Sequence, residues 1–219
     1  MTARAGSALV AASLVFSALV ASAEEAGQRH LIYLHGRIVQ EQQSRRPKHA
    51  EFGYYELDAI LDAFRQRGFA VTCDVRPKGM TLAAAASQAI AEVHGLLAAG
   101  VPAKRITVLG ASMGSSVALL ASLKLRNREL NFALLGTCLS LNVPLFVAEH
   151  GHGPAGHVLA IREKSDETSE PCPPWRDDAR SRATLEVREL VLDTGLRHGF
   201  LYRPLPEWVD PVVEWATLR

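Results

Sequence analysis

The sequence predicts an α/β fold with a mostly parallel central sheet of about six strands and helices on both faces. Short apolar runs alternate along the chain with longer helical patterns, as in parallel strands joined by helical crossovers. The runs are continuously hydrophobic, which indicates strands buried on both faces of the sheet. The expected strands are residues 30–35, 70–75, 105–109, 132–135, 157–162 and 186–192.

The helices are predicted from the spacing of their apolar residues. In one of them Leu57, Ile60 and Phe64 recur at three- and four-residue intervals and line one side. The polar stretch over residues 37–53 has no such pattern and is expected to be a long loop, of the kind that often carries function. The expected helices are residues 54–67, 82–99, 112–125, 141–148 and 206–218.

The composition of the chain is that of an ordinary globular protein. It has 219 residues, of which 48% are hydrophobic and 21% charged, and its formal net charge is +1. A charge so close to zero gives no indication of nucleic acid or an anionic membrane as a partner. Because no repeat, low-complexity tract or linker divides residues 24–219, they are expected to form a single α/β domain.

The N-terminus has the pattern of a secretory signal peptide. Arg4 precedes an apolar stretch over residues 9–20, and Ala21-Ser22-Ala23 has the form of a cleavage site. The apolar stretch is shorter than the roughly 20 helical residues that span a bilayer. We therefore predict cleavage after Ala23 and export to the periplasm or the medium, without stable membrane association afterwards. An uncleaved anchor is the alternative.

Export would place the three cysteines in an oxidising compartment. Because their number is odd, at most one disulfide forms and one thiol stays free. Cys73 lies within an apolar run and is expected to be a small core residue. A bridge between Cys138 and Cys172 is the most sensible pairing, although the sequence alone does not establish it.

Residues 110–114, GASMG, place a serine between two glycines where an expected strand leads into an expected helix. In that context the G-x-S-x-G pattern marks a sharp turn that lifts the serine hydroxyl out at the carboxyl edge of the sheet, where open α/β sheets bind ligands. Such a turn brings Gly110 and Gly114 close to neighbouring backbone, where only small residues fit. Ser112 is therefore the candidate nucleophile, and a simple helix cap is the alternative.

A serine hydroxyl needs a base within hydrogen-bond reach and an acid that orients the base. In folds that carry this motif, the acid and then the histidine follow the serine along the chain. Asp166 and His198 fit this order, and each follows an expected strand, at the same sheet edge as Ser112. The alternatives to Asp166 are Glu163, Glu167 and, as the most serious rival, Asp193.

The other histidines downstream of the serine form a cluster that leads into the amino end of an expected strand. That is the edge opposite Ser112, and glycines surround the cluster without a helix to fix the ligand spacing. A surface loop is therefore favoured over a metal site. The cluster consists of His150, His152 and His157.

Acyl transfer also needs donors for a developing oxyanion. The backbone N–H of Met113, directly after the candidate nucleophile, is one expected donor. The N–H of Arg37 is the other, because it follows the first expected strand and the glycine at position 36. His35 precedes the serine in the chain and is expected to shape this loop rather than to act as a base.

Taken together, these motifs resemble the α/β-hydrolase superfamily, in a small lidless form similar to the carboxylesterase and dienelactone-hydrolase-like groups. The resemblance runs from about residue 30 to the C-terminal helix and rests on LIYLHGR, VLGASMGS, the Asp166 loop and RHGF. It implies Ser112 as nucleophile, His198 as base and Asp166 as the partner of the base, with no cofactor or metal. The chain departs from the superfamily in lacking room for a full eight-stranded sheet or a cap domain.

The expected function is a carboxylesterase-like serine hydrolase that cleaves a small acyl ester through an acyl-enzyme. An acyltransferase or thioesterase with the same triad, or a non-catalytic binding protein on this scaffold, is the alternative. A shallow pocket bordered by residues 37–53 would favour short, soluble esters, since each buried methylene contributes only about 0.8 kcal/mol. Several cations near this edge would either select an anionic ester or simply face water: Arg37, Arg45, Arg46, Lys48, Arg76 and Lys78.

Overall fold

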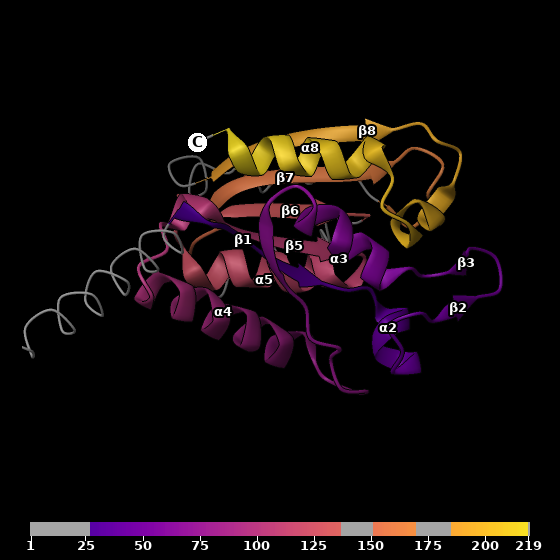
Figure 1. Ribbon diagram of the computed structural model, residues 1–219, viewed down its shortest axis with the longest axis horizontal. Coiled ribbons are helices and arrows are strands. Elements are labelled where there is room, and N and C mark those ends of the chain that lie inside the picture. Colours follow the sequence, from indigo (N-terminus) through magenta and orange to yellow (C-terminus); the bar gives the residue numbers. More distant parts are fainter. Residues whose placement is uncertain (1–26, 137–150, 170–184, 219) are drawn as a thin grey trace, which may run out of the picture.

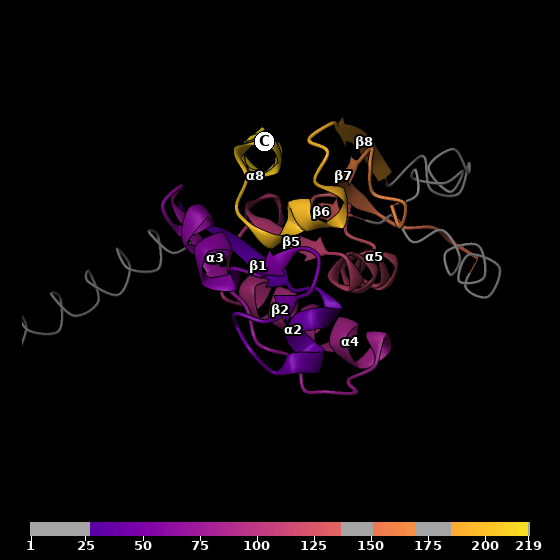
Figure 2. The ribbon, with the colours of Figure 1, turned by 90° about the vertical axis from the view of Figure 1, so that its right-hand side faces the viewer.

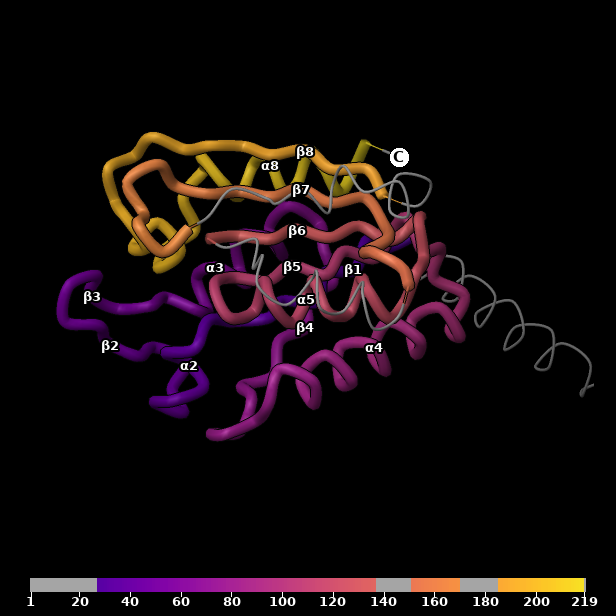
Figure 3. Tube along the Cα trace, turned by 180° about the vertical axis from the view of Figure 1, so that it is seen from behind, coloured from indigo at the N-terminus to yellow at the C-terminus, as the bar shows by residue number. Residues whose placement is uncertain are grey.

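The computed structural model describes residues 27–136, 151–169 and 185–218. Its centre is a six-stranded sheet in the order β4-β1-β5-β6-β7-β8, and every neighbouring pair of strands is parallel (Figure 3). The strands are β1 (Arg29–Leu34), β4 (Phe69–Thr72), β5 (Ile106–Ala111), β6 (Asn131–Leu135), β7 (Gly156–Glu163) and β8 (Leu185–Leu192). The predicted strands are therefore confirmed, with shifts at their ends.

The ends of the strands differ where tertiary pairing decides them. β4 stops at Thr72, three residues before the predicted end, because its register with β1 ends at the Ile32–Thr72 pair. At the other edge, β8 alternates between partly buried and exposed residues instead of being continuously buried. Among the described strands β8 lies at an edge of the sheet, a position where exposed charged side chains such as Glu186 and Arg188 are common.

The helices cover both faces of the sheet, as predicted (Figures 1 and 2). α3 (Leu57–Arg65) and α8 (Pro206–Thr217) lie on one face, and α4 (Leu82–Ala98) and α5 (Met113–Leu125) lie on the other. α3 begins three residues later than predicted because Tyr54 belongs to a short strand instead. The helix predicted over residues 141–148 lies outside the described residues.

The prediction of a long loop over residues 37–53 is wrong. The segment contains the helix α2 (Arg37–Gln42) and the strand β2 (Lys48–His49), which pairs in a hairpin with β3 (Gly53–Tyr54). The segment has no apolar pattern that would predict this structure, because amide side chains supply the contacts that hold it in place. Gln40 is buried and donates to the carbonyl oxygen of Met80 at 3.0 Å, and Gln42 donates to that of Lys48 at 3.0 Å.

The core forms two apolar clusters, one on each face of the sheet. Successive residues of β1 show the division, because side chains alternate across a strand. Leu31 and Tyr33 pack with α3 and α8, whereas Ile32 and Leu34 pack with α4 and α5. The carboxyl ends of the strands lie at the right in Figure 1, beside α2 and the β2–β3 hairpin. This packing holds the sheet rigid and leaves that edge to carry a site.

The predictions about the cysteines, the signal peptide and the domain boundary can be compared with the structure only in part. Cys73 is partly buried against the core, and burial raises the pKa of its thiol to about 12. The Cys138–Cys172 bridge and the signal peptide over residues 1–23 lie outside the described residues. A single domain over residues 24–219 stays a prediction. Among the described helices, none combines the length and apolarity needed to cross a membrane.

Candidate active site

Ser112 lies at the sharp turn between β5 and α5. Its backbone has φ 53° and ψ −119°, a combination that residues other than glycine rarely adopt and that costs about 1–3 kcal/mol. The surroundings hold it there: the Ser112 N–H donates to the carbonyl oxygen of Leu135 at 2.8 Å, and the Ser115 N–H donates to that of Ser112 at 2.8 Å. The turn thus keeps the hydroxyl of Ser112 at the carboxyl edge of the sheet.

The two glycines of the motif are required by close backbone contacts, as predicted. A Cβ at Gly110 would lie 2.1 Å from the carbonyl oxygen of Gly114, and a Cβ at Gly114 would lie 1.8 Å from that of Leu34. Real Cβ atoms essentially never come within 3.0 Å of another heavy atom, so backbone would have to move at either position.

We expect Gly114→Ala to destabilise the protein by about 3 kcal/mol, because β1 and α5 must separate to admit the methyl group. Gly95→Ala is the matched control, because that glycine lies in α4 with open space around it. It should leave stability unchanged or raise it by up to about 1 kcal/mol. Urea unfolding measures both. Equal midpoints for Gly114→Ala and the wild type would contradict the close contact.

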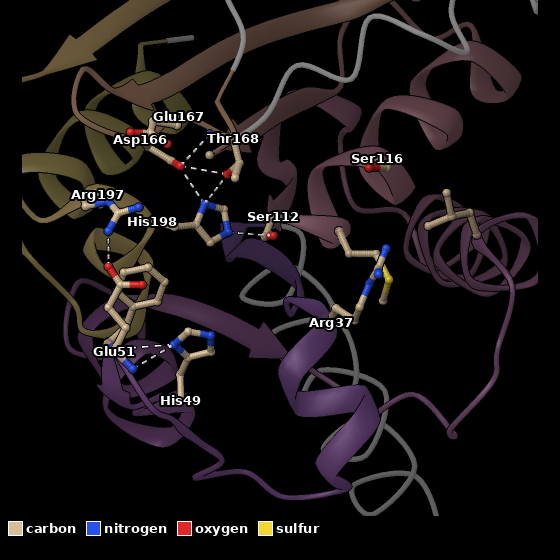
Figure 4. Close-up of a pocket in the computed structure, with 14 residues that line it drawn as sticks. Arg37, His49, Glu51, Ser112, Ser116, Asp166, Glu167, Thr168, Arg197 and His198 are labelled. Carbon is tan, nitrogen blue, oxygen red and sulfur yellow. Dashed lines mark hydrogen bonds and ion pairs between the residues drawn. The ribbon is translucent and has the colours of Figure 1, made fainter.

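His198 and Asp166 join Ser112 in one hydrogen-bonded series (Figure 4). His198 lies on the 3₁₀ helix η3 (Arg197–Tyr202), which follows β8, and Asp166 lies in the loop after β7. The Nε2 atom of His198 is 2.9 Å from Ser112 Oγ, and its Nδ1 atom is 2.6 Å from Asp166 Oδ2. The structure therefore brings together the three side chains that the sequence order selected.

The surroundings of Asp166 fix its charge and the tautomer of His198. Burial would raise the pKa of this carboxyl, but hydrogen bonds from His198 and Thr168 outweigh it and hold the pKa below its usual range. The Thr168 N–H and hydroxyl both donate to Oδ1, at 3.0 and 2.7 Å. Since an ionised carboxylate only accepts, Nδ1 of His198 must donate to it, which leaves Nε2 of the neutral ring to accept from Ser112.

The rival acids have other roles. Asp193 forms an exposed ion pair with Lys164 at 2.9 Å, and Glu167 lines the cleft described below. Glu163 is fully buried and accepts hydrogen bonds from two loops. Of these four candidate acids, Asp166 is the one that contacts His198.

The two expected oxyanion donors flank Ser112. Met113 is the first residue of α5 and Arg37 the first of α2, positions at which a helix leaves its N–H groups without intrahelical partners. The backbone before Arg37 passes close to the serine, since a Cβ at Gly36 would lie 3.6 Å from the Cβ of Ser112. The two expected donors therefore come from backbone that adjoins Ser112.

Comparisons with known proteins agree with this architecture. No protein-family model matches the sequence, and neither does any curated protein. Among solved structures, a protein of Xanthomonas campestris described as a candidate hydrolase of the α/β superfamily is 16% identical, with a TM-score of 0.54 over 87% of this chain and 98% of that one. The chain has the α/β-hydrolase fold.

Other solved structures share this α/β-hydrolase fold. A candidate dienelactone hydrolase of Klebsiella pneumoniae is 13% identical over 87% of each chain, with a TM-score of 0.56. An α/β-hydrolase enzyme from a deep-sea metagenome library of the Medee basin is 13% identical over 88% of this chain and 85% of that one, with a TM-score of 0.50. At these identities the likeness concerns the fold alone.

Within the α/β-hydrolase fold, the site opens into a cleft of about 640 Å³ (Figure 4). The β2–β3 hairpin borders it, as expected for residues 37–53, through His49, Glu51 and Phe52. The ring of Phe52 lies 6.5 Å from that of His198 and stacks on His49 at 4.7 Å. Sequence reasoning missed Phe52 because the contact depends on the hairpin, and it missed Thr168, whose position two residues after an aspartate is a signal for a local side-chain turn.

The cations at this edge are mostly engaged elsewhere. Arg45 pairs with Asp58, Arg46 pairs with Glu56, and Arg76 is buried. Of the six cations singled out in the sequence, Arg37 is the one that lines the cleft. Arg197, which the sequence did not single out, also lines it and forms an ion pair with Glu51. Of these cations, Arg37 is therefore the one placed to contact an anionic substrate in the cleft.

The histidine cluster predicted as a surface loop is only partly such a loop. His157 is buried in β7 and stacks on Trp215 with 3.8 Å between ring centroids, so the prediction is wrong for this residue. His157 is the second residue of β7 and therefore lies within the sheet. His150 lies outside the described residues. Among the described residues, no group of three or more histidine, cysteine or acidic side chains is arranged to hold a metal ion.

His35 supports the loop that carries Arg37. It is fully buried, its Nε2 accepts the N–H of Arg76 at 3.0 Å, and its Nδ1 donates to the carbonyl oxygen of Gly36 at 2.9 Å. The Arg76 guanidinium donates in turn to the carbonyl oxygen of His35 and, at 3.1 Å, to Gln40. Burial and the charge of Arg76 lower the pKa of His35 to about 4, so its ring is neutral at pH 7.

We expect His35 to make the folded state less stable as pH falls from 6.5 to 4. In this range the unfolded chain protonates the histidine and the folded chain does not, which amounts to about 3 kcal/mol over the whole range. His35→Asn should therefore show a shallower loss of unfolding free energy than the wild type when both are unfolded in urea between pH 7 and pH 4. Identical slopes would mean that His35 is not buried as a neutral ring.

Proposed function

We propose that this protein is a serine hydrolase that cleaves small acyl esters, with Ser112 as nucleophile, His198 as general base and Asp166 as the acid that orients it. The observation that supports this most strongly is the continuous hydrogen-bonded series from Asp166 through His198 to a serine held at a strained turn. Neither a helix cap nor a binding surface needs that series of contacts.

The reaction follows from the geometry. Ser112 Oγ attacks the carbonyl carbon of the ester while Nε2 of His198, 2.9 Å away, takes its proton. Asp166 stabilises the imidazolium that forms, and the N–H groups of Met113 and Arg37 stabilise the tetrahedral oxyanion. The leaving alcohol receives the proton from Nε2. Water then attacks the acyl-enzyme by the same steps, releasing the acid and restoring the serine.

The cleft favours a short acyl group. Arg37 and Ser116 line the cleft on the side of Ser112 away from His198 (Figure 4). Because the leaving oxygen must lie near Nε2 to receive its proton, the acyl group extends toward this side. There it meets a charged and a hydroxyl group, so a long alkyl chain gains little from burial against them.

A series of p-nitrophenyl esters with acyl chains of two to twelve carbons tests the proposal. We expect kcat/KM to be highest for the shortest members and to show no jump where a substrate passes its solubility limit. Matched thioesters, and product analysis with added alcohol, test for thioesterase and acyltransferase activity. Folded, pure protein that cleaves none of these substrates would contradict the proposal and favour a binding protein.

A further inference from the structure

Glu163 joins the two loops that carry the acid and the base of the proposed triad. It is the last residue of β7, three positions before Asp166, and its side chain is fully buried. Its Oε1 accepts from the N–H and hydroxyl of Ser165 at 3.2 and 3.0 Å, on the Asp166 loop. Its Oε2 accepts from the N–H and hydroxyl of Thr194 at 3.0 and 2.7 Å, on the His198 loop.

The same contacts keep Glu163 charged. Burial alone would raise the pKa of its carboxyl, but the hydrogen bonds from Thr194 and Ser165 outweigh that cost and hold the pKa below its usual range. Gly195 adds a longer backbone contact of 3.4 Å to Oε1. A buried carboxylate that accepts from both loops holds them at one point, since losing either set of donors would leave part of its buried charge without hydrogen bonds.

From Ser165 the connection continues to the residue before the base. The Ser165 hydroxyl accepts the backbone N–H of Arg197 at 3.1 Å. Arg197 has a φ of 52°, in the left-handed region that residues other than glycine and asparagine seldom occupy. Ser165 thus helps to hold the strained residue that directs His198 toward Asp166 and Ser112.

We propose that Glu163 is a positioning residue for the proposed hydrolase site, holding the Asp166 and His198 loops so that Nδ1 of His198 stays within hydrogen-bond distance of Asp166. The inference rests on the proposed function for its kinetic consequences. Its structural consequence, the geometry of the Asp166–His198 pair, does not depend on activity.

Glu163→Gln tests the proposal, because the amide keeps the shape of the side chain but turns one acceptor into a donor facing groups that also donate. We expect kcat to fall about 100-fold with little change in KM, as for a misplacement of the base by about 1 Å. Asp193→Asn is the matched control. Its ion pair with Lys164 joins the same two loops at the exposed surface, and losing it should change kcat by less than about twofold.

Two readouts separate positioning from stability alone. The proton between His198 Nδ1 and Asp166 should give a far-downfield ¹H NMR resonance in the wild type and in Asp193→Asn, and that resonance should be shifted or lost in folded Glu163→Gln. In a double-mutant cycle, Glu163→Gln should lower kcat by less than about threefold when Asp166 is already Asn, because both changes act on one pair.

Ser165→Ala provides the same test if Glu163→Gln does not fold. It leaves the carboxylate in place and removes its hydroxyl link to Arg197, so we expect a similar change in the resonance and a fall in kcat of about tenfold. An unchanged resonance and kcat in a folded variant, or an effect of Glu163→Gln that multiplies fully with that of Asp166→Asn, would overturn the proposal. A wild type that shows the resonance but cleaves no ester would overturn the proposed function and leave the positioning testable by NMR.

Discussion

Ser112→Ala is expected to lower kcat for ester hydrolysis about a million-fold, because it removes the protein atom that forms the acyl-enzyme in the proposed mechanism. Residual turnover would come from the oxyanion donors and from water activated by His198. Stability should change little, since alanine meets the same backbone strain at φ 53° and fills less space. Initial rates on the best short ester, together with urea unfolding, measure both effects.

The control for this variant is Ser87→Ala, which removes an exposed hydroxyl on α4 that donates to the helix's own backbone. It should retain full activity. If Ser112→Ala kept activity within tenfold of the wild type, the nucleophile would be another residue or a water molecule, and the proposed mechanism would be wrong.

Asp166→Asn is expected to lower kcat about 10⁴-fold, through the tautomer of His198. Thr168 donates twice to Oδ1, so the amide oxygen of an asparagine should occupy that position and its NH₂ group should face His198. Nδ1 would then have to accept and Nε2 would carry the proton. A ring in that state offers Ser112 no lone pair, so it does not take the proton of the hydroxyl.

Asp193→Asn tests whether this loss is specific. Asp193 was the most serious rival acid in the sequence, yet it is exposed and pairs with Lys164. We expect its replacement to leave kcat and the pH profile unchanged. A loss in Asp193→Asn as large as that in Asp166→Asn would show that the acid had been wrongly assigned.

The parts of the site that the sequence predicted are those fixed by local pattern and topology. Gly110 and Gly114 bracket a turn whose sterics depend on the immediate backbone, so a five-residue motif was enough to place Ser112. Asp166 and His198 each follow a strand, and the carboxyl ends of parallel strands meet at one edge. Their order in the chain was therefore sufficient to predict their proximity, although not which of four nearby acids faces the histidine.

The parts that the sequence did not predict depend on contacts between distant segments. Residues 37–53 have the polar composition of a loop, and the contact that fixes their helix joins the buried amide of Gln40 to a carbonyl 40 positions away. Phe52 reaches His198 only because the hairpin folds over η3, where Gly199 leaves room for its ring. The sequence offers Glu163 as a rival acid, and no residue near it in the chain indicates that Thr194, on another loop, donates to its carboxylate.

The most direct test of the proposed nucleophile is covalent labelling with a fluorophosphonate, read by intact-mass and peptide mass spectrometry. The proposed mechanism predicts one adduct per chain, on Ser112, with labelling abolished in Ser112→Ala and strongly slowed in Asp166→Asn. Folded protein that takes up no label, or a label that persists at another residue in Ser112→Ala, would contradict the assignment of Ser112 as the nucleophile of a hydrolase.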